Sequence, residues 1–353
     1  MEPSRFQVRI LAAGIPTMNP LHSLLLDWFQ SNDRQLPWRE SKDPYRVWVS
    51  EIMLQQTQVT TVIPYFQRWM NRFPTLESLA KTPPEDVLGY WQGLGYYRRC
   101  KLLLQGVQQV ANSGQFPHSV DEWLKVAGVG RYTAGAIASI SQSIPAPIVD
   151  GNIIRIFSRL TDNGSPFDQL EKEAWNWASL NLNHQNPGDW NQSLMELGQL
   201  VCTATSPKCE HCPISAHCKA FQKGTVALRP QKKERPNRKF LAWSIDVPIK
   251  QVENSQVLVG LKQAHTNEWW SDLWVLPYRN IDDKTSKEQS DDTFTLTSGE
   301  NQISFVVTKH HIQATFQRVL QDESADLVFF TQSELETLPI PAPFRKILNK
   351  VLK

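Results

Sequence analysis

Four cysteines fall within 17 residues of this 353-residue chain, and their spacing suggests metal chemistry. They are Cys202, Cys209, Cys212 and Cys218, in the pattern C-x6-C-x2-C-x5-C, and the fifth cysteine, Cys100, stands apart. Thiolates this close in sequence can converge on one metal centre in a reducing compartment. Four thiolates suit either tetrahedral zinc or a four-iron, four-sulfur cluster. Structural zinc usually uses two C-x2-C pairs and this chain has one, so the spacing favours the cluster over zinc or unliganded thiols.

Two carboxylates lie in settings that suit proton transfer. Glu51 follows the apolar run VWV at 47–49, and such surroundings raise a glutamate pKa and make the group a proton donor near neutrality. Asp150 follows the apolar pair IV at 148–149. The simpler alternatives are a partly exposed Glu51 and an Asp150 that only caps the following helix, a role that Asn152 could also fill.

A short glycine turn, VAGVG at 126–130, lies between two stretches of helical pattern. Gly128 and Gly130 let the chain turn tightly and bring bare N–H groups close to an anion, with a helix N-terminus behind them. Such turns are common between helices. The motif alone therefore leaves open whether the turn contacts a nucleic-acid phosphate or only connects two helices.

The elements that would position these residues differ along the chain. Residues 21–223 carry apolar side chains at helical spacing, with Pro and Gly at the breaks, and Thr75 and Thr82 are candidate helix starts. Further segments read as strands at 240–247, 256–261 and 303–308, a polar loop at 282–292 and a helix at 342–353. We predict a mainly α N-terminal half followed by an α+β domain.

Composition excludes some classes of protein but does not identify a partner. Hydrophobic residues make up 41% and charged residues 20% of the chain, which excludes wholesale disorder. No apolar run approaches the ~20 residues that a membrane helix needs, so we expect a cytoplasmic protein without a signal peptide or membrane contact. The net charge is +2, yet residues 229–239 hold six basic residues and one acidic. Such a basic segment is either a polyanion contact or a solvated linker.

Together these residues resemble the MutY family of adenine DNA glycosylases, within the helix-hairpin-helix superfamily that includes endonuclease III. The resemblance runs from about residue 36 to residue 218. The motifs that carry it are LPWR at 36–39, WVSEIMLQQTQV at 48–59, GLGYY at 93–97, GVGRYTAGAI at 128–137, VDGN at 149–152 and the four-cysteine spacing.

The resemblance implies an architecture, a cofactor and a substrate. It implies a helix-hairpin-helix six-helix barrel with an iron–sulfur module in residues 1–223, a cluster loop at 202–218 holding one [4Fe-4S] cluster, a basic linker at 224–239 and a Nudix-like domain at 240–353. It also implies a monomer that acts in base excision repair and that, if the source is bacterial, is cytoplasmic and associated with the nucleoid. The implied substrate is duplex DNA in which adenine is mispaired with 8-oxoguanine or guanine.

The resemblance also assigns roles in glycosidic bond cleavage. Glu51 would protonate adenine at N7, Asp150 would stay ionised and stabilise the sugar cation, and Glu51 or Asn152 would place a water. Trp38 and Arg39 match residues that line the adenine pocket. The remaining matches concern DNA: a wedge of Gln56, Leu94 and Tyr96, which enters the stack that the flipped nucleotide leaves, and the hairpin residues Gly128, Gly130 and Tyr132.

Three departures from relatives refine the expected chemistry. Tyr132 stands where the endonuclease III branch has a Lys whose amine would form a Schiff base and cut the strand, so a monofunctional glycosylase is favoured. Ala127 replaces the usual Pro of the hairpin, and Ile154 stands where some relatives carry a Lys. The alternatives are a pyrimidine-damage glycosylase with lyase activity and a non-catalytic iron–sulfur protein that binds DNA.

The second domain resembles the family's Nudix-like domain loosely, through EWWSDLWVLP at 268–277. It lacks the R-E-x-x-E-E box that would hold magnesium, so pyrophosphate hydrolysis is disfavoured and recognition of the base opposite adenine is expected. The family's Phe-Ser-His reader triplet aligns with a loop at 309–311. We expect Lys309 to contact phosphate and His310 to accept the N7 hydrogen of 8-oxoguanine, with His311 as the one matching residue. A solvated polar turn is the alternative.

Overall fold

The computed structural model of this chain describes residues 19–32, 34–231, 239–252, 256–265, 268–271, 273–281, 301–321 and 326–352. By its contacts the chain divides into two units, one of Met1–Glu51 with Phe116–Lys233 and one of Ile52–Gln115 with Glu234–Lys353. Residues 232–238 of the predicted linker and all of the predicted loop at 282–292 lie outside the described residues. No helix of the described part is long and apolar enough to cross a membrane.

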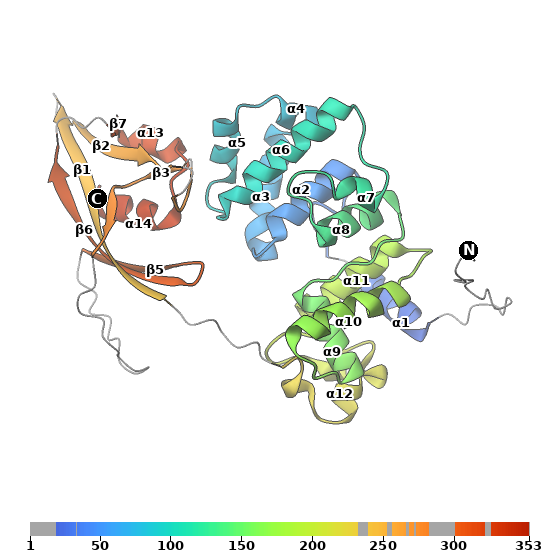
Figure 1. The fold of residues 1–353 in the computed structure, drawn as a ribbon. Helices are drawn as coiled ribbons and strands as arrows, with labels where there is room; N and C mark the ends of the chain where they lie inside the picture. The colour runs from blue at the N-terminus through green and yellow to red at the C-terminus, as the bar shows by residue number, and fades with distance from the viewer. Residues whose placement is uncertain are drawn as a thin grey trace, which may run out of the picture. The chain divides into compact units, whose positions relative to one another are not determined.

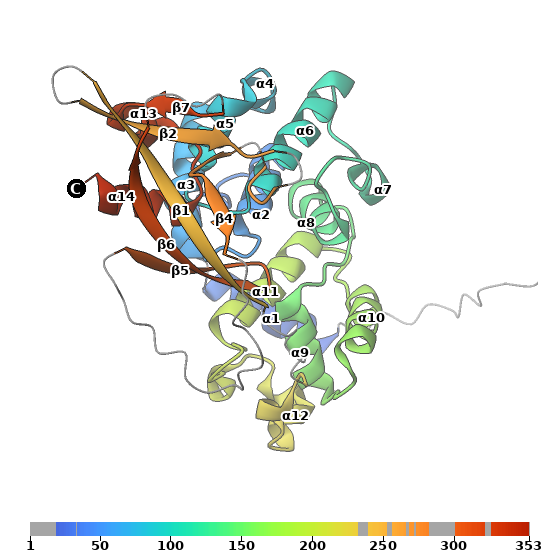
Figure 2. The same cartoon turned by 60° about the vertical axis from the view of Figure 1, so that its left-hand side comes forward.

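The first unit is helical and is built around α11 (Pro187–Leu200), which contacts α1 (Pro20–Ser31), α8 (Arg131–Gln142) and α9 (Gly151–Thr161). Its other elements are most of α2 (Pro44–Leu54), α7 (Val120–Trp123), α10 (Phe167–Leu180), α12 (Lys219–Gln222) and the 3-10 turns η1 (Cys209–His211), η2 (Ser215–His217) and η3 (Val226–Leu228). Figures 1 and 2 both show α12 against one end of α9. The predicted helical character of this half is confirmed.

Helix α9 shows why these segments fold as they do. Its apolar side chains Ile153, Ile156 and Leu160 recur at helical spacing and are buried against α10 and α11. Asp150 is its N-cap and accepts a hydrogen bond from the backbone N–H of Ile153 at 2.8 Å. The capping role that the sequence offered as an alternative for Asp150 is therefore present.

The helical part of the second unit holds α3 (Val59–Arg72), α4 (Leu76–Ala80), α5 (Pro84–Trp91) and α6 (Tyr97–Ser113). Thr75 starts α4 with a capping box that includes Ser78, as predicted. The predicted start at Thr82 is wrong. The Thr82 hydroxyl donates to the carbonyl of Ser78 at 2.8 Å instead, and α5 begins at Pro84, where proline suits the first helical turn.

The C-terminal part of the second unit is a mixed sheet with two helices, which confirms the predicted α+β domain. In the described residues seven strands form one sheet in the order β3-β2-β1-β6-β5, with β4 paired to β1 and β7 to β2. Figure 1 shows α13 (Gln332–Thr337) and α14 (Ala342–Val351) on the same side of this sheet. The strands are β1 (Lys239–Val252), β2 (Gln256–Gln263), β3 (Trp274–Val275), β4 (Tyr278–Asn280), β5 (Gln302–Val307), β6 (His310–Leu320) and β7 (Val328–Phe330).

Strand pairing and core packing explain the sheet's stability. Strands β1 and β6 run parallel along their length, from Lys239 opposite His310 to Ile249 opposite Leu320. The other pairs, such as β5 with β6, are antiparallel. One face of the sheet buries apolar side chains against Phe344 and Ile347 of α14. The strands predicted at 240–247, 256–261 and 303–308 are present, but Thr308 lies just beyond β5.

Candidate active site and cysteine cavity

Glu51 lies buried on α2, with 5% of its surface exposed. Burial raises the pKa of its carboxyl from 4.5 to about 7. A hydrogen bond with Tyr132 and the charge of Arg39 oppose that rise, whereas the charge of Asp150 adds to it. The raised pKa predicted from the apolar neighbours of Glu51 is confirmed, and the group is poised to hold a proton near neutral pH.

Asp150 occupies a different environment at the N-terminus of α9. Burial raises the pKa of Asp150, but hydrogen bonds from the backbone N–H of Ile153 and from Asn152 and the charge of Arg155 oppose that rise. The Asn152 side chain donates to Asp150 Oδ2 at 2.8 Å. Burial is the largest influence on both carboxyls, but more hydrogen bonds favour the ionised form at Asp150, where Ile153 and Asn152 donate, than at Glu51, where Tyr132 does.

A chain of hydrogen bonds runs from Asp150 to the cysteine loop. Arg155 donates to Asn152 Oδ1 at 2.8 Å and to the carbonyl of Cys202 at 2.7 Å. It also donates to the carbonyl of Gly198 at 2.8 Å. A Cβ at Gly198 would lie 2.6 Å from the Cβ of Asn152, so only glycine allows α11 to approach Asn152 this closely. Sequence reasoning missed Arg155, whose partners are remote along the chain.

Arg39 is held in place by α11. Its guanidinium donates to Glu196 Oε1 at 2.6 Å and to Gln192 Oε1 at 3.0 Å, and it lies over the ring of Phe29. Glu196 is 2% exposed and also pairs with Arg34 at 2.6 Å. Charge-assisted pairs of this kind orient a guanidinium firmly. Glu196 was missed in the sequence, where it is one of two acidic residues in the segment 187–200 and no local pattern marks it as a partner of Arg39.

The hairpin and Tyr132 lie at the start of α8. Gly128 has φ of 77°, a left-handed conformation that favours glycine, whereas Gly130 has an extended backbone and is the N-cap of α8. Of the two glycines in the predicted turn, only Gly128 therefore adopts a backbone conformation that favours glycine. The Tyr132 hydroxyl hydrogen-bonds with Glu51 and lies 3.6 Å from Met195 Sδ. The first unit thus brings Arg39, Glu51, Tyr132, Asp150 and Asn152 into one network.

The four cysteines line one cavity, together with Arg159, Val201, Phe221 and other side chains. Among the described residues, no three His, Cys, Asp or Glu side chains are grouped as ligands of a single metal ion. Thiols that surround a cavity fit a polynuclear iron–sulfur cluster better than one zinc ion. The predicted ligands are thus gathered at one site, at Cys202, Cys209, Cys212 and Cys218.

The predicted wedge residues lie in the second unit at two left-handed turns. Gln56 has φ of 57° and Tyr96 has φ of 48°. Tyr96 is 61% exposed, whereas Leu94 is only 6% exposed. An exposed ring is free to enter a base stack, so Tyr96 suits the predicted role and Leu94 does so less well. Arg99, which the sequence did not single out, donates to the carbonyls of Ile52 and Gln55 and lies over the Tyr96 ring.

Residues 309–311 are not a loop as expected, because His310 and His311 are the first residues of strand β6. Thr308, with φ of 54°, and Lys309 form the turn between β5 and β6. The His311 ring contacts the Ser304 hydroxyl at 2.8 Å, and the His310 ring lies 5.0 Å from that of Trp269. Only Lys309 of the three stands exposed in the turn.

Two family models match the chain. The model of the HhH-GPD superfamily base excision DNA repair protein matches residues 49–179, and that of the iron–sulfur binding domain of endonuclease III matches residues 202–218. The second match spans the four cysteines and supports the assignment of the cavity to an iron–sulfur cluster.

The chain is similar to several proteins called adenine DNA glycosylase. It is 42% identical over 226 residues to the Arabidopsis thaliana protein, covering 56% of this chain and 36% of that protein. It is 42% identical over 212 residues to the Homo sapiens protein, covering 56% of this chain and 39% of that protein. It is 30% identical over 354 residues to the protein of Buchnera aphidicola subsp. Schizaphis graminum, covering 94% and 99%. The chain thus spans less than half the length of the plant and human relatives.

Solved structures resemble the helical part of the chain. A thermostable thymine-DNA glycosylase is 27% identical with a TM-score of 0.53, covering 57% of this chain and 95% of that one. Endonuclease III in a non-covalent DNA complex is 21% identical with a TM-score of 0.50, covering 58% and 95%. The second likeness concerns the fold alone.

Proposed function

Because this chain belongs to the family of adenine DNA glycosylases, we propose that it hydrolyses the N-glycosidic bond of adenine mispaired with 8-oxoguanine or guanine in duplex DNA. The observation that carries the proposal is the pair of carboxylates formed by the buried Glu51 and the partly buried Asp150, which have different hydrogen-bond partners. Glu51 has its pKa raised to about 7 by burial, and Asp150 is surrounded by donors. Two such acids can divide the work of glycosidic cleavage between them.

Glu51 would act first as the general acid. Its proton passes to N7 of adenine, the bond between the sugar C1′ and N9 breaks, and the bonding electron pair leaves with the base. A pKa near the working pH suits this transfer, because the group is still protonated yet gives up its proton readily. The Tyr132 hydroxyl, which is hydrogen-bonded to Glu51, would hold the carboxyl in one orientation.

Asp150 would stabilise the positive charge that develops on the sugar. The backbone N–H of Ile153 and the Asn152 amide hold its carboxylate in place before the reaction begins. Water then adds to C1′, and its proton goes to the carboxylate of Glu51, which restores the acid for the next turnover. Asn152, which donates to Asp150, is the second candidate for placing that water.

A Tyr at position 132 supports a glycosylase without strand cleavage. A phenol hydroxyl cannot form the Schiff base through which an amine would open the sugar. The product is therefore free adenine and an abasic site in an intact strand.

Access to the base requires that the nucleotide leave the duplex, which costs a few kcal/mol. The exposed Tyr96 and Gln56 are proposed to fill the gap, with Leu94 behind them, and stacking on one aromatic ring can return ~1–3 kcal/mol. The backbone of the hairpin at Gly128 and Gly130 is proposed to hold a DNA phosphate.

In the adenine pocket, Trp38 and Arg39 are proposed to contact the flipped base. Arg39 is already oriented by Glu196, so its guanidinium needs little reordering when adenine arrives.

The cysteine cavity is proposed to hold one [4Fe-4S] cluster, bound by Cys202, Cys209, Cys212 and Cys218. Bound there, the cluster would supply a structural frame and a site for electron transfer. The loop between Cys202 and Cys209 also carries Lys208, a cation suited to DNA phosphate. We propose that the protein acts as a monomer.

The C-terminal domain is proposed to read the base opposite adenine. Lys309 is exposed in the β5–β6 turn and suits a phosphate contact. His310 and His311, at the start of β6, offer ring nitrogens that could accept the N7 hydrogen of 8-oxoguanine. Because the His311 ring contacts Ser304 of β5 and the His310 ring lies beside that of Trp269, either histidine would have to give up a contact on binding DNA.

The test is incubation with duplexes that carry 8-oxoguanine:A, G:A and G:T pairs. We expect free adenine from the first two, with the strand intact until alkali is added. Release of thymine from G:T would favour the activity named for the similar thymine-DNA glycosylase. Borohydride trapping of a covalent complex would favour a lyase, and unchanged DNA would favour a binding protein.

A further inference from the structure

Arg159 is a buried cation between the cysteine cavity and the segment that follows it. It lies on α9, is 4% exposed and lines the cavity of the four cysteines. Its guanidinium donates to Cys202 Sγ at 3.3 Å and to the carbonyl of Thr203 at 2.7 Å. From Nε it donates to the carbonyl of Arg229 at 3.0 Å. The Arg159 side chain thus contacts both Cys202, a predicted cluster ligand, and Arg229, which lies 27 residues after Cys202 in the chain.

The positive charge of Arg159 has no carboxylate in contact with it among the described residues. Within the described ranges, its hydrogen-bond acceptors are carbonyl oxygens and the Cys202 sulfur, with no carboxylate among them. A buried cation without an anionic partner is costly. Thiolates bound to an iron–sulfur cluster carry negative charge beside this guanidinium. A cluster bound in the cavity would therefore supply the negative charge that Arg159 otherwise lacks.

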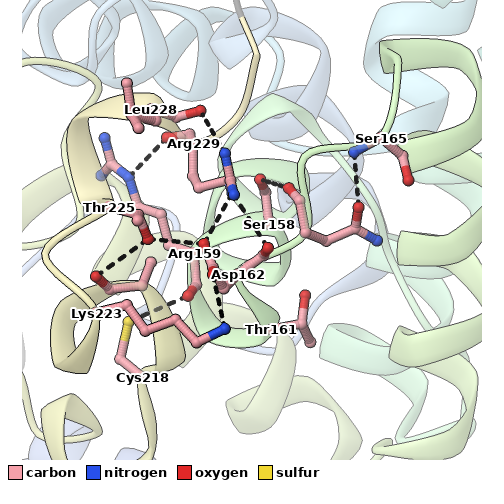
Figure 3. Close-up of polar contacts among 12 residues, drawn as sticks. Ser158, Arg159, Thr161, Asp162, Ser165, Cys218, Lys223, Thr225, Leu228 and Arg229 are labelled. Carbon is pink, nitrogen blue, oxygen red and sulfur yellow. Dashed lines mark hydrogen bonds and ion pairs between the residues drawn. The ribbon is translucent and has the colours of Figure 1, made fainter.

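A second anchor lies at the C-terminal end of the same helix, where Asp162 is the cap. Asp162 Oδ1 accepts a hydrogen bond from the Thr225 hydroxyl at 2.7 Å and pairs with Arg229 Nε at 2.9 Å. Its Oδ2 pairs with Lys223 at 3.2 Å. Figure 3 shows these side chains converging on Asp162, with Arg159 and Cys218 beside them. These contacts hold the pKa of Asp162 below its usual range.

We propose that Arg159 and Asp162 couple cluster binding to the anchoring of residues 223–229, the segment that leads toward the C-terminal domain. Arg159 is a positioning residue for the cluster ligand Cys202, and Asp162 fastens the same segment that Arg159 contacts at Arg229. Loading the cavity stabilises the segment, and fastening the segment slows loss of the cluster. The inference rests on the iron–sulfur cluster and not on the adenine glycosylase activity.

The test compares full-length holoprotein of the wild type with Asp162→Asn and Arg159→Lys. Bleaching of the visible absorbance during incubation with bathophenanthroline measures cluster loss, and hydrogen exchange of the amides of residues 223–229 measures anchoring. For Asp162→Asn, we expect exchange to speed up about fivefold, the factor for one lost hydrogen bond. Cluster loss should speed up by a similar factor. Arg159→Lys keeps the positive charge but loses the several N–H donors of the guanidinium. The rate of amide exchange and the rate of cluster loss should therefore also rise.

The matched control is Glu171→Gln, the same change of carboxylate to amide at an exposed position of α10. It should leave both rates within about twofold of the wild type, a difference below ~0.4 kcal/mol. If Asp162→Asn speeds exchange while cluster loss stays at the control rate, the two anchors are independent and the coupling is refuted. A colourless wild-type protein without iron would overturn the inference at its base, whereas failure to release adenine would count only against the proposed function.

Discussion

The substitution Glu51→Gln separates the chemical role of this acid from its effect on stability. Native burial moves the carboxyl pKa from 4.5 to about 7. Below the lower value the group is neutral in both folded and unfolded chains and leaves stability unchanged. As pH rises from 4.5 to about 7, the Glu51 carboxyl ionises in the unfolded chain but stays protonated in the folded one. The folded state therefore loses stability over this interval, until the pH exceeds about 7. Gln carries no proton to lose and is free of this penalty.

The size of the effect follows from the two pKa values. The full difference corresponds to about 3 kcal/mol, at ~1.4 kcal/mol for each pH unit between them. Between about pH 5.5 and about pH 8.5, the free energy of unfolding of Glu51→Gln should therefore gain about 2 kcal/mol relative to the wild type. Urea titrations followed by tryptophan fluorescence at both pH values measure this gain. Glu40→Gln, at a side chain that is 72% exposed, is the control and should show no such trend.

The same variant tests the chemistry. Loss of a general acid should lower the single-turnover rate of adenine release by ~10²-fold or more. In the wild type the rate should fall as pH rises through about 7, because the acid is then ionised, and this fall should be missing in Glu51→Gln. Two results would refute the reasoning: a variant rate that keeps the same fall near pH 7, or a stability difference that does not change with pH.

Three further predictions concern the other groups. Asp150→Asn should still bind the mispaired duplex but release adenine at least about tenfold more slowly (~1.4 kcal/mol), because its charge acts on the transition state; equal single-turnover rates would exclude this role. Cys209→Ser should lose visible absorbance and bind DNA more weakly, and a colourless wild type with stoichiometric zinc would contradict the cluster. His310→Ala should narrow the preference for 8-oxoguanine:A over G:A by about tenfold or less, whereas Lys309→Ala should weaken binding to both duplexes alike and lower the salt dependence by about one phosphate contact. Binding titrations on both duplexes decide between the two effects.

Some of the differences between expectation and structure had a signal in the sequence. Strand β6 alternates buried Ile312, Ala314 and Phe316 with more exposed side chains, which is the period of a strand with one face in the core. That alternation extends the strand back to His310 and leaves Thr308 and Lys309 as the turn. The error at Thr82 likewise arose because a hydroxyl can bond backward to a carbonyl as readily as it can cap a helix.

Other features have no local signal. Arg39 and Glu196 are 157 residues apart and Arg155 and Cys202 are 47 apart, yet each pair is in hydrogen-bond contact. An Arg in a sequence is most often a solvated charge. Only the approach of α9 and α11 turns Arg155 into a link between Asn152 and the cysteine loop.

By itself, the sequence was enough to propose which residues carry the chemistry of this protein. The cysteine spacing, the hairpin and the Asp150 cap depend on contacts within a few residues, so short motifs are enough to specify them. The tertiary structure alone decided how those residues behave. Desolvation by the whole helical unit sets the Glu51 pKa, and distant partners orient Arg39 and Tyr132. Burial and charge are sums over neighbours from many segments, and no single stretch of sequence contains them.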